Sequence, residues 1–235
     1  KDIWRLNGKE YPSRQHGFAR DSEFICTDIT DTSLTFVLKS SEETLKVYPF
    51  VFALKITYTL KEHDLDVCWE VVNKDSETMY FTIGGHPAFR VPVREGESQS
   101  DYRLAFEEQD ALTYLLIDTS VGTVIADEPH TLSLEKGTCT IDPHMFDKDA
   151  LVFDNGQIQK AGILLPDGTP YLTLTSEGFP NFGIWSVPGA PFVCLEPWMG
   201  RCDDCGFEKP LSEKANINVL KPDEEFIRSY QITVH

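Results

Sequence analysis

An alternation of apolar and polar residues with a period of two runs through residues 50–60. Every even position in this stretch is apolar, whereas polar residues such as Lys55 and Thr57 lie between them. Successive side chains of a β-strand point to opposite faces, so the pattern predicts a strand with one buried face. It excludes an amphipathic helix, in which apolar residues recur every three to four positions.

The same alternation resumes at the odd positions from Leu65 to Val71, after the polar residues 61–64. We therefore predict a long antiparallel hairpin with a four-residue connection. Gly, Pro, Asn and Asp separate further short strands, and no window carries a helical apolar stripe. These strands are predicted at residues 34–38, 78–83, 102–106, 171–175, 182–186, 192–195, 217–220 and 226–234. The chain is thus predicted to be all-β, an antiparallel sandwich or barrel.

The organisation of the chain indicates one continuous domain over residues 1–235, because it contains neither an internal repeat nor a low-complexity linker. With 41% hydrophobic residues, the chain can bury a large core. Its net charge of −17 argues against nucleic acid and an anionic membrane surface as partners. No stretch approaches the roughly 20 apolar residues that span a bilayer, and the first residues lack an apolar signal core. We expect a cytoplasmic location.

The six cysteines are scattered, and a chain of this length does not need disulfide bonds, so we expect reduced thiols. Cys202 and Cys205 have the spacing of a metal or redox pair. The sequence offers no second pair of ligands for zinc and no βαβ setting for a redox motif. We therefore expect no metal site at this pair.

Three segments concentrate polar side chains beside glycine or proline. In the first, residues 15–20, His16 and Arg20 flank a turn of small residues. An imidazole and a guanidinium placed together can bind sugar hydroxyls or the oxygens of an anion. The alternative is a structural ion pair of Arg20 with Asp21 or Glu23.

The second segment, residues 84–89, has the sequence GGHPAF and directly follows the predicted strand 78–83. The two glycines permit unusual backbone angles and leave space for a ligand, and Pro87 stiffens the chain after His86. His86 is therefore a candidate acid or base held at the end of a strand. The alternative is a structural histidine in a turn.

The third segment places Glu196 after the apolar strand 192–195, with Trp198 two residues later. Burial among apolar groups would raise the pKa of Glu196 towards neutral pH, as a general base requires. The indole can cover the apolar face of a pyranose. The alternative is a buried Glu196 paired with Arg201.

In this order, the three segments resemble the aldose 1-epimerase (galactose mutarotase) family, and most closely its LacX-like branch. The resemblance lies in residues 16–20, 81–89, 184–186 and 192–198, and it extends over nearly the whole chain. It implies a large antiparallel β-sandwich, the galactose mutarotase-like supersandwich, with a sugar bound in an open cleft. Members of the family begin some tens of residues earlier, so we expect the chain to lack the first strands of the fold.

The resemblance also implies an activity, the interconversion of the α and β anomers of a free hexose without a cofactor or a metal. Glu196 resembles the general base that takes the proton of the C1 hydroxyl, and His86 resembles the general acid that protonates the ring oxygen. The substrate would be bound by His16, Arg20, Asp149, Trp185 and Trp198.

Three alternatives remain open at this point. A hexose 6-phosphate epimerase would need basic side chains, for which Arg20, Arg90 and Arg94 are the candidates. A non-catalytic sugar-binding or sensor domain would use Trp185 and Trp198 as stacking platforms. A retaining glycosidase would need two carboxyl groups about 5–5.5 Å apart, and Asp203 and Asp204 are its candidates. The last ranks lowest because the matched partner of Glu196 is an imidazole, and the charge of −17 favours a neutral sugar over a phosphorylated one.

Overall fold

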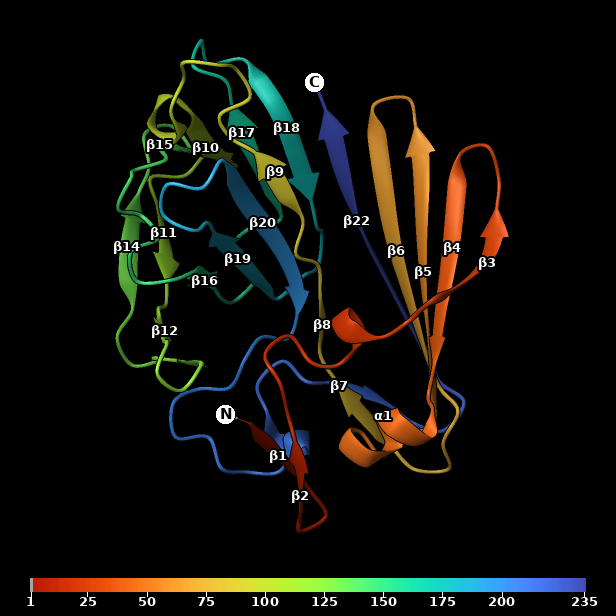
Figure 1. Cartoon of the computed structure of the whole chain (residues 1–235). Helices are drawn as coiled ribbons and strands as arrows, with labels where there is room; N and C mark the ends of the chain where they lie inside the picture. Colours follow the sequence, from red (N-terminus) through yellow and green to blue (C-terminus); the bar gives the residue numbers. More distant parts are fainter. Residues whose placement is uncertain (1) are drawn as a thin grey trace. The chain divides into compact units, whose positions relative to one another are not determined.

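A computed structural model describes residues 2–235 (Figure 1). The described residues form two compact units. Unit 1 comprises the residues up to Thr82 together with Phe207–Gln231, and unit 2 comprises Ile83–Gly206 together with Ile232–His235. Strands predominate in both units, which confirms the all-β prediction. The organisation as a single domain over residues 1–235 stays a prediction.

The main sheet of unit 1 contains the predicted hairpin. Its neighbours follow the order β3, β4, β5, β6 and β22, formed by Ile25–Ile29, Ser33–Lys39, Phe52–Lys61, Asp64–Asn73 and Glu225–Val234. Lys61 pairs with Asp64, so the connection has two residues rather than four. Its first residue, Glu62, has φ of 54°, and the hairpin turns more tightly than the polar run suggested. Val67 and Trp69 are buried, as the alternation predicts.

The remaining elements of unit 1 are short. β1 (Ile3–Leu6) pairs with β2 (Lys9–Pro12), and β7 (Met79–Phe81) pairs with β21 (Asn218–Leu220). The helix α1 (Glu42–Val47) was not predicted, because six residues are too few to show an apolar stripe. It begins with a capping box in which the side chains of Ser41 and Thr44 bind each other's backbone N–H groups.

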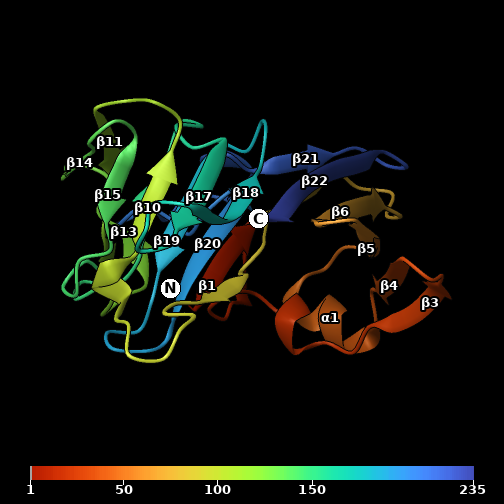
Figure 2. The same ribbon diagram turned by 90° about the horizontal axis from the view of Figure 1, so that it is seen from above.

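Unit 2 contains two antiparallel sheets among its described residues (Figures 1 and 2). The first has the order β15, β10, β17, β18, formed by Thr138–Thr140, Arg103–Phe106, Lys160–Leu164 and Pro170–Thr175. The second has the order β16, β19, β20, β8, with β9 also paired to β20; these strands are Leu151–Phe153, Asn181–Trp185, Phe192–Met199, Ile83–Gly84 and Ala88–Arg90. Two small hairpins complete the unit, β11 (Ala111–Tyr114) with β14 (His130–Ser133) and β12 (Ile117–Asp118) with β13 (Thr123–Val124).

The core of unit 2 takes side chains from both sheets, as in a sandwich. Leu104, Ile163 and Leu174 of the first sheet and Ile184 and Leu195 of the second are completely buried. The residues that alternate with these core residues point to the other face of each sheet, where they can form a functional site.

β20 is longer than the predicted strand 192–195, which is a correction to the sequence analysis. It continues to Met199, so Glu196 and Trp198 lie inside the strand rather than after it. A proline inside a strand is unusual, because it has no N–H for the ladder. The carbonyl of Pro197 accepts a hydrogen bond from the N–H of Gly85 at 3.0 Å.

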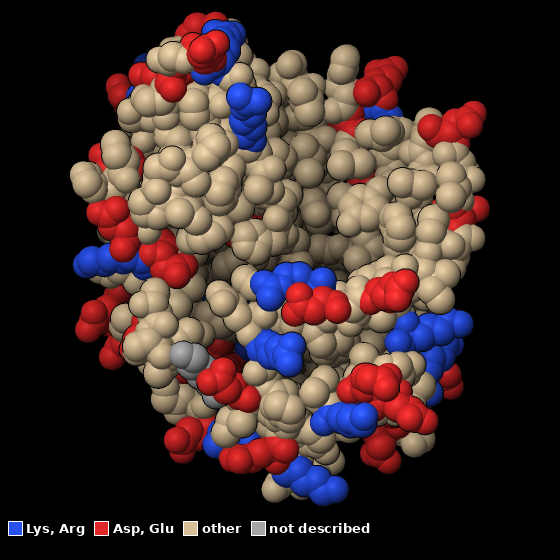
Figure 3. All heavy atoms as spheres, viewed as in Figure 1, with Lys and Arg blue, Asp and Glu red and all other residues tan. Residues whose placement is uncertain are grey.

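Acidic residues number 38 against 21 basic ones. Figure 3 shows their side chains scattered over the visible surface, with Lys and Arg interspersed. Among residues 2–235, no helix combines the length and apolar character that crossing a membrane requires.

Candidate active site

One face of β20 gathers several of the candidate site residues of unit 2. Because side chains alternate along a strand, Cys194, Glu196 and Trp198 lie on the same face. β19 flanks β20 on one side, and β8 and β9 flank it on the other. The side chain of Glu196 is only 4% exposed. The strand therefore presents a carboxylate that is almost removed from water.

His86 lies on the short connection between β8 and β9. Backbone hydrogen bonds hold this connection against β20, from Gly85 N–H to Pro197 O at 3.0 Å and from Leu195 N–H to Pro87 O at 3.3 Å. The Nδ1 atom of His86 thereby lies 3.3 Å from Oε1 of Glu196. The imidazole is 39% exposed, so it faces solvent above the buried carboxylate. These two side chains are the candidate acid and base, and we call them the acid/base pair.

The surroundings of Glu196 favour its neutral form. Burial raises its pKa to about 8. A hydrogen bond from the indole of Trp198 to the carboxylate lowers the pKa and opposes this effect, whereas the negative charge of Asp149 raises it further. A carboxyl group with a pKa near neutral pH can both accept and return a proton.

Arg201 does not supply the countercharge of Glu196 that the alternative interpretation required. Its guanidinium binds Asp154, with Nε at 2.8 Å from Oδ1 and Nη2 at 2.8 Å from Oδ2. Nη2 also lies 2.8 Å from the carboxylate of Asp204. Asn181 donates a further hydrogen bond to Asp154 at 2.7 Å. Arg201 therefore belongs to a separate buried network.

Trp185 and Asp149 are the other predicted site residues in unit 2. The ring of Trp185, on β19, meets the His86 imidazole edge-on, with centroids 5.8 Å apart and planes at 83°. Asp149 has φ of 76°, and its carboxylate accepts a hydrogen bond from the N–H of Ala150 at 2.7 Å. Its effect on the pKa of Glu196 shows that it lies within electrostatic range of the acid/base pair. Unit 2 thus brings five of the predicted residues together, namely His86, Glu196, Trp185, Trp198 and Asp149.

His16 and Arg20 lie in unit 1. His16 has φ of 66°, and Gly17 follows it in the same left-handed region, which produces the predicted turn. The exposed Arg20 has its Nε 3.4 Å from Oδ1 of Asp21, the ion pair that the sequence analysis gave as the alternative. The assignment of His16 and Arg20 to substrate binding stays a prediction.

Cys194 was missed by the sequence analysis. Its Sγ, a ring nitrogen of His86 and a carboxylate oxygen of Glu196 all lie within 4.8 Å of one another. These three donors could hold a divalent ion of borderline softness. Burial raises the pKa of the Cys194 thiol to about 12, with the charge of Glu196 adding to the effect, so the protein alone keeps the sulfur protonated. The period of two would have identified Cys194 if the strand had been predicted to continue to Met199.

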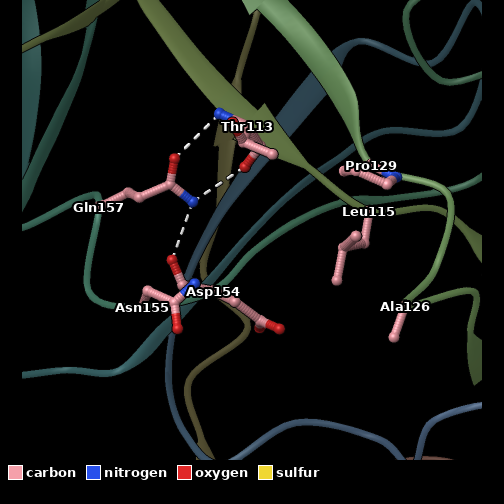
Figure 4. A pocket seen from close by; sticks show the side chains of 7 residues that line it. All are labelled: Thr113, Leu115, Ala126, Pro129, Asp154, Asn155 and Gln157. Atoms are coloured by element: carbon pink, nitrogen blue, oxygen red, sulfur yellow. Dashed lines mark hydrogen bonds between the residues drawn. The ribbon is translucent and has the colours of Figure 1, made fainter.

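A pocket of about 400 Å³ lies elsewhere in unit 2 (Figure 4). It is lined by Thr113, Leu115, Ala126, Pro129, Asp154, Asn155 and Gln157. The side-chain amide of Gln157 makes two hydrogen bonds to the backbone of Thr113. Its oxygen accepts from the Thr113 N–H and its nitrogen donates to the Thr113 carbonyl, both at 2.9 Å (Figure 4). The charge of Asp154 is already paired with Arg201. The predicted site residues do not line this pocket, which therefore offers no acid/base pair.

Comparison with known proteins agrees with this fold. The family model described as aldose 1-epimerase matches residues 3–225. The plasmid-encoded and the chromosomal LacX proteins of Lactococcus lactis are each 29% identical to this chain over 223 residues, which cover 94% of this chain and 75% of LacX.

Solved structures with similar folds include a galactose mutarotase related enzyme from Lactobacillus acidophilus. It has a TM-score of 0.92 and 32% identity, and the match covers 100% of this chain and 78% of that one. A galactose mutarotase-like protein from Lactobacillus casei has a TM-score of 0.88 and 30% identity, with 100% and 80% covered. The fold is therefore that of the galactose mutarotase-like β-sandwiches. The chain belongs to the aldose 1-epimerase family, and within it to the LacX-like proteins.

Proposed function

We propose that this protein interconverts the α and β anomers of a free hexose, with Glu196 as general base and His86 as general acid. The observation that carries the proposal is the acid/base pair, in which Nδ1 of His86 lies 3.3 Å from Oε1 of Glu196. Membership of the aldose 1-epimerase family supports a sugar as the substrate.

The reaction needs two proton transfers, one at each of the two oxygen atoms bonded to C1. Opening the hemiacetal removes the proton of the C1 hydroxyl and delivers a proton to the ring oxygen, while the bond between C1 and the ring oxygen breaks. Glu196 takes the first proton and His86 gives the second. Rotation about the C1–C2 bond turns the aldehyde over, and the same two groups then close the ring in reverse.

The protonation of the acid/base pair suits this scheme. Carboxylate with imidazolium holds the same number of protons as carboxylic acid with imidazole, so a single proton moving between the two side chains sets up the reactive form. Burial brings the pKa of Glu196 to about 8, which makes the carboxylate a much stronger base than an exposed one. Neither group is consumed, and each returns to its starting state within a turnover.

The experiment is polarimetry on freshly dissolved α-glucose and α-galactose. We expect the parent protein to speed the approach to equilibrium, and Glu196→Gln and His86→Ala each to lose about 10²- to 10⁴-fold in kcat/KM. Lys61→Ala, which removes an exposed ion pair of unit 1, is the control and should leave the rate unchanged. Parent-like rates in both site variants would exclude this mechanism. Binding of the sugar without any acceleration would favour a non-catalytic sugar-binding domain.

A further inference from the structure

The indole of Trp198 lies across β20 and covers two glycines on the neighbouring strands. A Cβ atom added at Gly84 of β8 would lie 2.4 Å from Cδ1 of the indole. A Cβ added at Gly183 of β19 would lie 2.4 Å from Cζ2 and Cη2 at the opposite edge of the indole. Trp198 pairs with Gly84 in the register, and Glu196 pairs with Gly183. The indole thus spans the width of three strands beside the carboxylate.

The indole is what requires glycine at these two positions. Neither Gly84 nor Gly183 has a positive φ, so their backbone conformation is open to any L-amino acid. A contact of 2.4 Å is far shorter than carbon atoms tolerate. The space that the sequence analysis assigned to a ligand above Gly84 is therefore occupied by the Trp198 ring.

Apolar packing and a hydrogen bond to Glu196 hold the indole of Trp198 in place. Trp198 packs against the buried cluster of Leu115, Val124 and Val152. Its N–H donates to the Glu196 carboxylate, which is the interaction that lowers the pKa of this group against the effect of burial. A rigid ring with a directed donor determines where the carboxylate points.

We infer that Trp198 is a positioning residue for Glu196, held in place by Gly84 and Gly183, and that it orients the carboxylate and stabilises its ionised form. Its role in the reaction rests on the proposed function, because it acts through Glu196. This inference differs from the stacking role predicted from the sequence, in which Trp198 would contact the sugar directly.

The test is Trp198→Phe, which keeps an aromatic ring and removes the N–H donor. The charged and titratable groups around Glu196 are His86, Asp149 and Cys194, and all three remain in this variant. We expect the midpoint at which kcat/KM falls at high pH to move upwards by about one pH unit. Because the proton then resides more on Glu196 than on His86, kcat at neutral pH should be roughly tenfold lower, with little change in KM. A raised KM with an unchanged pH profile would overturn the inference in favour of sugar stacking.

A matched control is Trp4→Phe in unit 1, where the indole N–H donates to the carbonyl of Val47 at 3.1 Å. The same chemical change there should leave the pH profile where it was. Gly183→Ala is an independent second variant, since its methyl group must displace the indole. It should reproduce the pH shift of Trp198→Phe, and in a Trp198→Ala background it should have little further effect. Additive effects of the two changes would contradict the coupling.

Titration of the Glu196 carboxyl carbon by ¹³C NMR separates this inference from the proposed function. The experiment needs no substrate and no activity. If the parent accelerates no anomer exchange but Trp198→Phe raises the titration midpoint, the proposed function fails and the positioning contact stands. If the parent is active and the midpoint does not move, the inference about Trp198 fails alone.

Discussion

The imidazole of His86 and the carboxylate of Glu196 meet at 3.3 Å although their exposures differ tenfold, at 39% and 4%. The exposed partner can exchange protons with solvent, whereas the buried partner is shielded from water. A base that is shielded keeps a high proton affinity, and an acid that is exposed is readily recharged. This asymmetry gives the acid/base pair several measurable properties.

The first prediction concerns the dependence of the rate on pH. Because burial raises the pKa of Glu196 to about 8, its basic form increases as the pH rises through this value. At the same pH the acid/base pair loses its one proton, which His86 must carry to act as the acid, so we expect kcat/KM, corrected for the spontaneous reaction, to fall between about pH 7 and 9. Stopped-flow or polarimetric rates over this range will measure it. A flat profile from pH 5 to 9 would show that Glu196 does not act as the base.

The second prediction concerns stability and follows from the same pKa. In the unfolded chain Glu196 loses its proton near the ordinary value of 4.5, whereas the folded protein retains it up to about pH 8. Folding therefore takes up a proton between these values, and the stability contributed by the neutral carboxyl is lost as the pH rises. Glu196→Gln cannot ionise, so its free energy of unfolding relative to the parent should increase with pH, by at most on the order of 4 kcal/mol at pH 8.

Urea unfolding of the parent and of Glu196→Gln at pH 5 and pH 9 will measure this difference. Glu10→Gln, in an exposed ion pair of unit 1, is the control and should show no such trend. A Glu196→Gln variant whose relative stability does not change with pH would contradict the raised pKa.

The third prediction concerns the buried network of Arg201. Asp154→Ala leaves a guanidinium that is 5% exposed with only Asp204 as its counterion. We expect a loss of about 3–5 kcal/mol in the free energy of unfolding. Arg94→Ala, which breaks an exposed pair with Glu97 at 3.6 Å in the same unit, should cost less than about 1 kcal/mol. Urea unfolding measures both losses. Equal losses in the two variants would show that the Arg201 network stabilises the protein no more than an exposed ion pair does.

The fourth prediction concerns Trp185, whose ring meets the His86 imidazole edge-on. If Trp185 forms a platform for the sugar, Trp185→Leu should raise KM by about 3- to 10-fold, the loss expected for one aromatic contact. Trp185→Phe should keep most of the parent's affinity. Isothermal titration with glucose gives the binding constant independently of the rate. Unchanged affinity in Trp185→Leu would remove Trp185 from the substrate-binding residues.

The fifth prediction distinguishes free from phosphorylated hexoses. A net charge of −17 repels a phosphate group, and Arg94, one candidate for binding it, is already paired with Glu97. NMR anomer exchange should show faster catalysis on glucose than on glucose 6-phosphate. The difference in rate between the two sugars should decrease as salt is added, because salt screens the repulsion between the protein and the phosphate group. Faster exchange of the phosphorylated sugar at low salt would support the hexose 6-phosphate alternative.

Much of the architecture was predictable because long strands display their buried face in the sequence. β5 and β6 each have ten residues, and their alternation indicated the hairpin correctly. Strands such as β12 and β13, with two residues each, are too short for any period to appear. The burial of Glu196 and the turn around His86 were also predictable, because each depends on residues adjacent in sequence, the apolar strand 192–195 and the glycines and proline beside His86.

Contacts across strands were not predictable in the same way. The approach of Trp198 to Gly183 depends on the register of β19 against β20, and nothing in either segment specifies that register by itself. For the same reason the alternative pairing of Arg201 with Glu196, five residues away in sequence, was wrong, because the main partner of Arg201 is Asp154, 47 residues away. Both the contact of Trp198 with Gly183 and the ion pair of Arg201 with Asp154 form only when segments distant in sequence come together.

The contact of one indole with two glycines also restricts how this site can evolve. Any side chain gained at Gly84 or Gly183 collides with Trp198, whereas a smaller residue at 198 would leave a hollow beside Glu196. A substitution at any one of these three positions is therefore disfavoured, whether the glycine or the tryptophan changes first. A different packing of this region requires that the three residues change together. Relatives that lack an aromatic residue at the position of Trp198 should carry larger residues opposite it, and their carboxylate would need another donor.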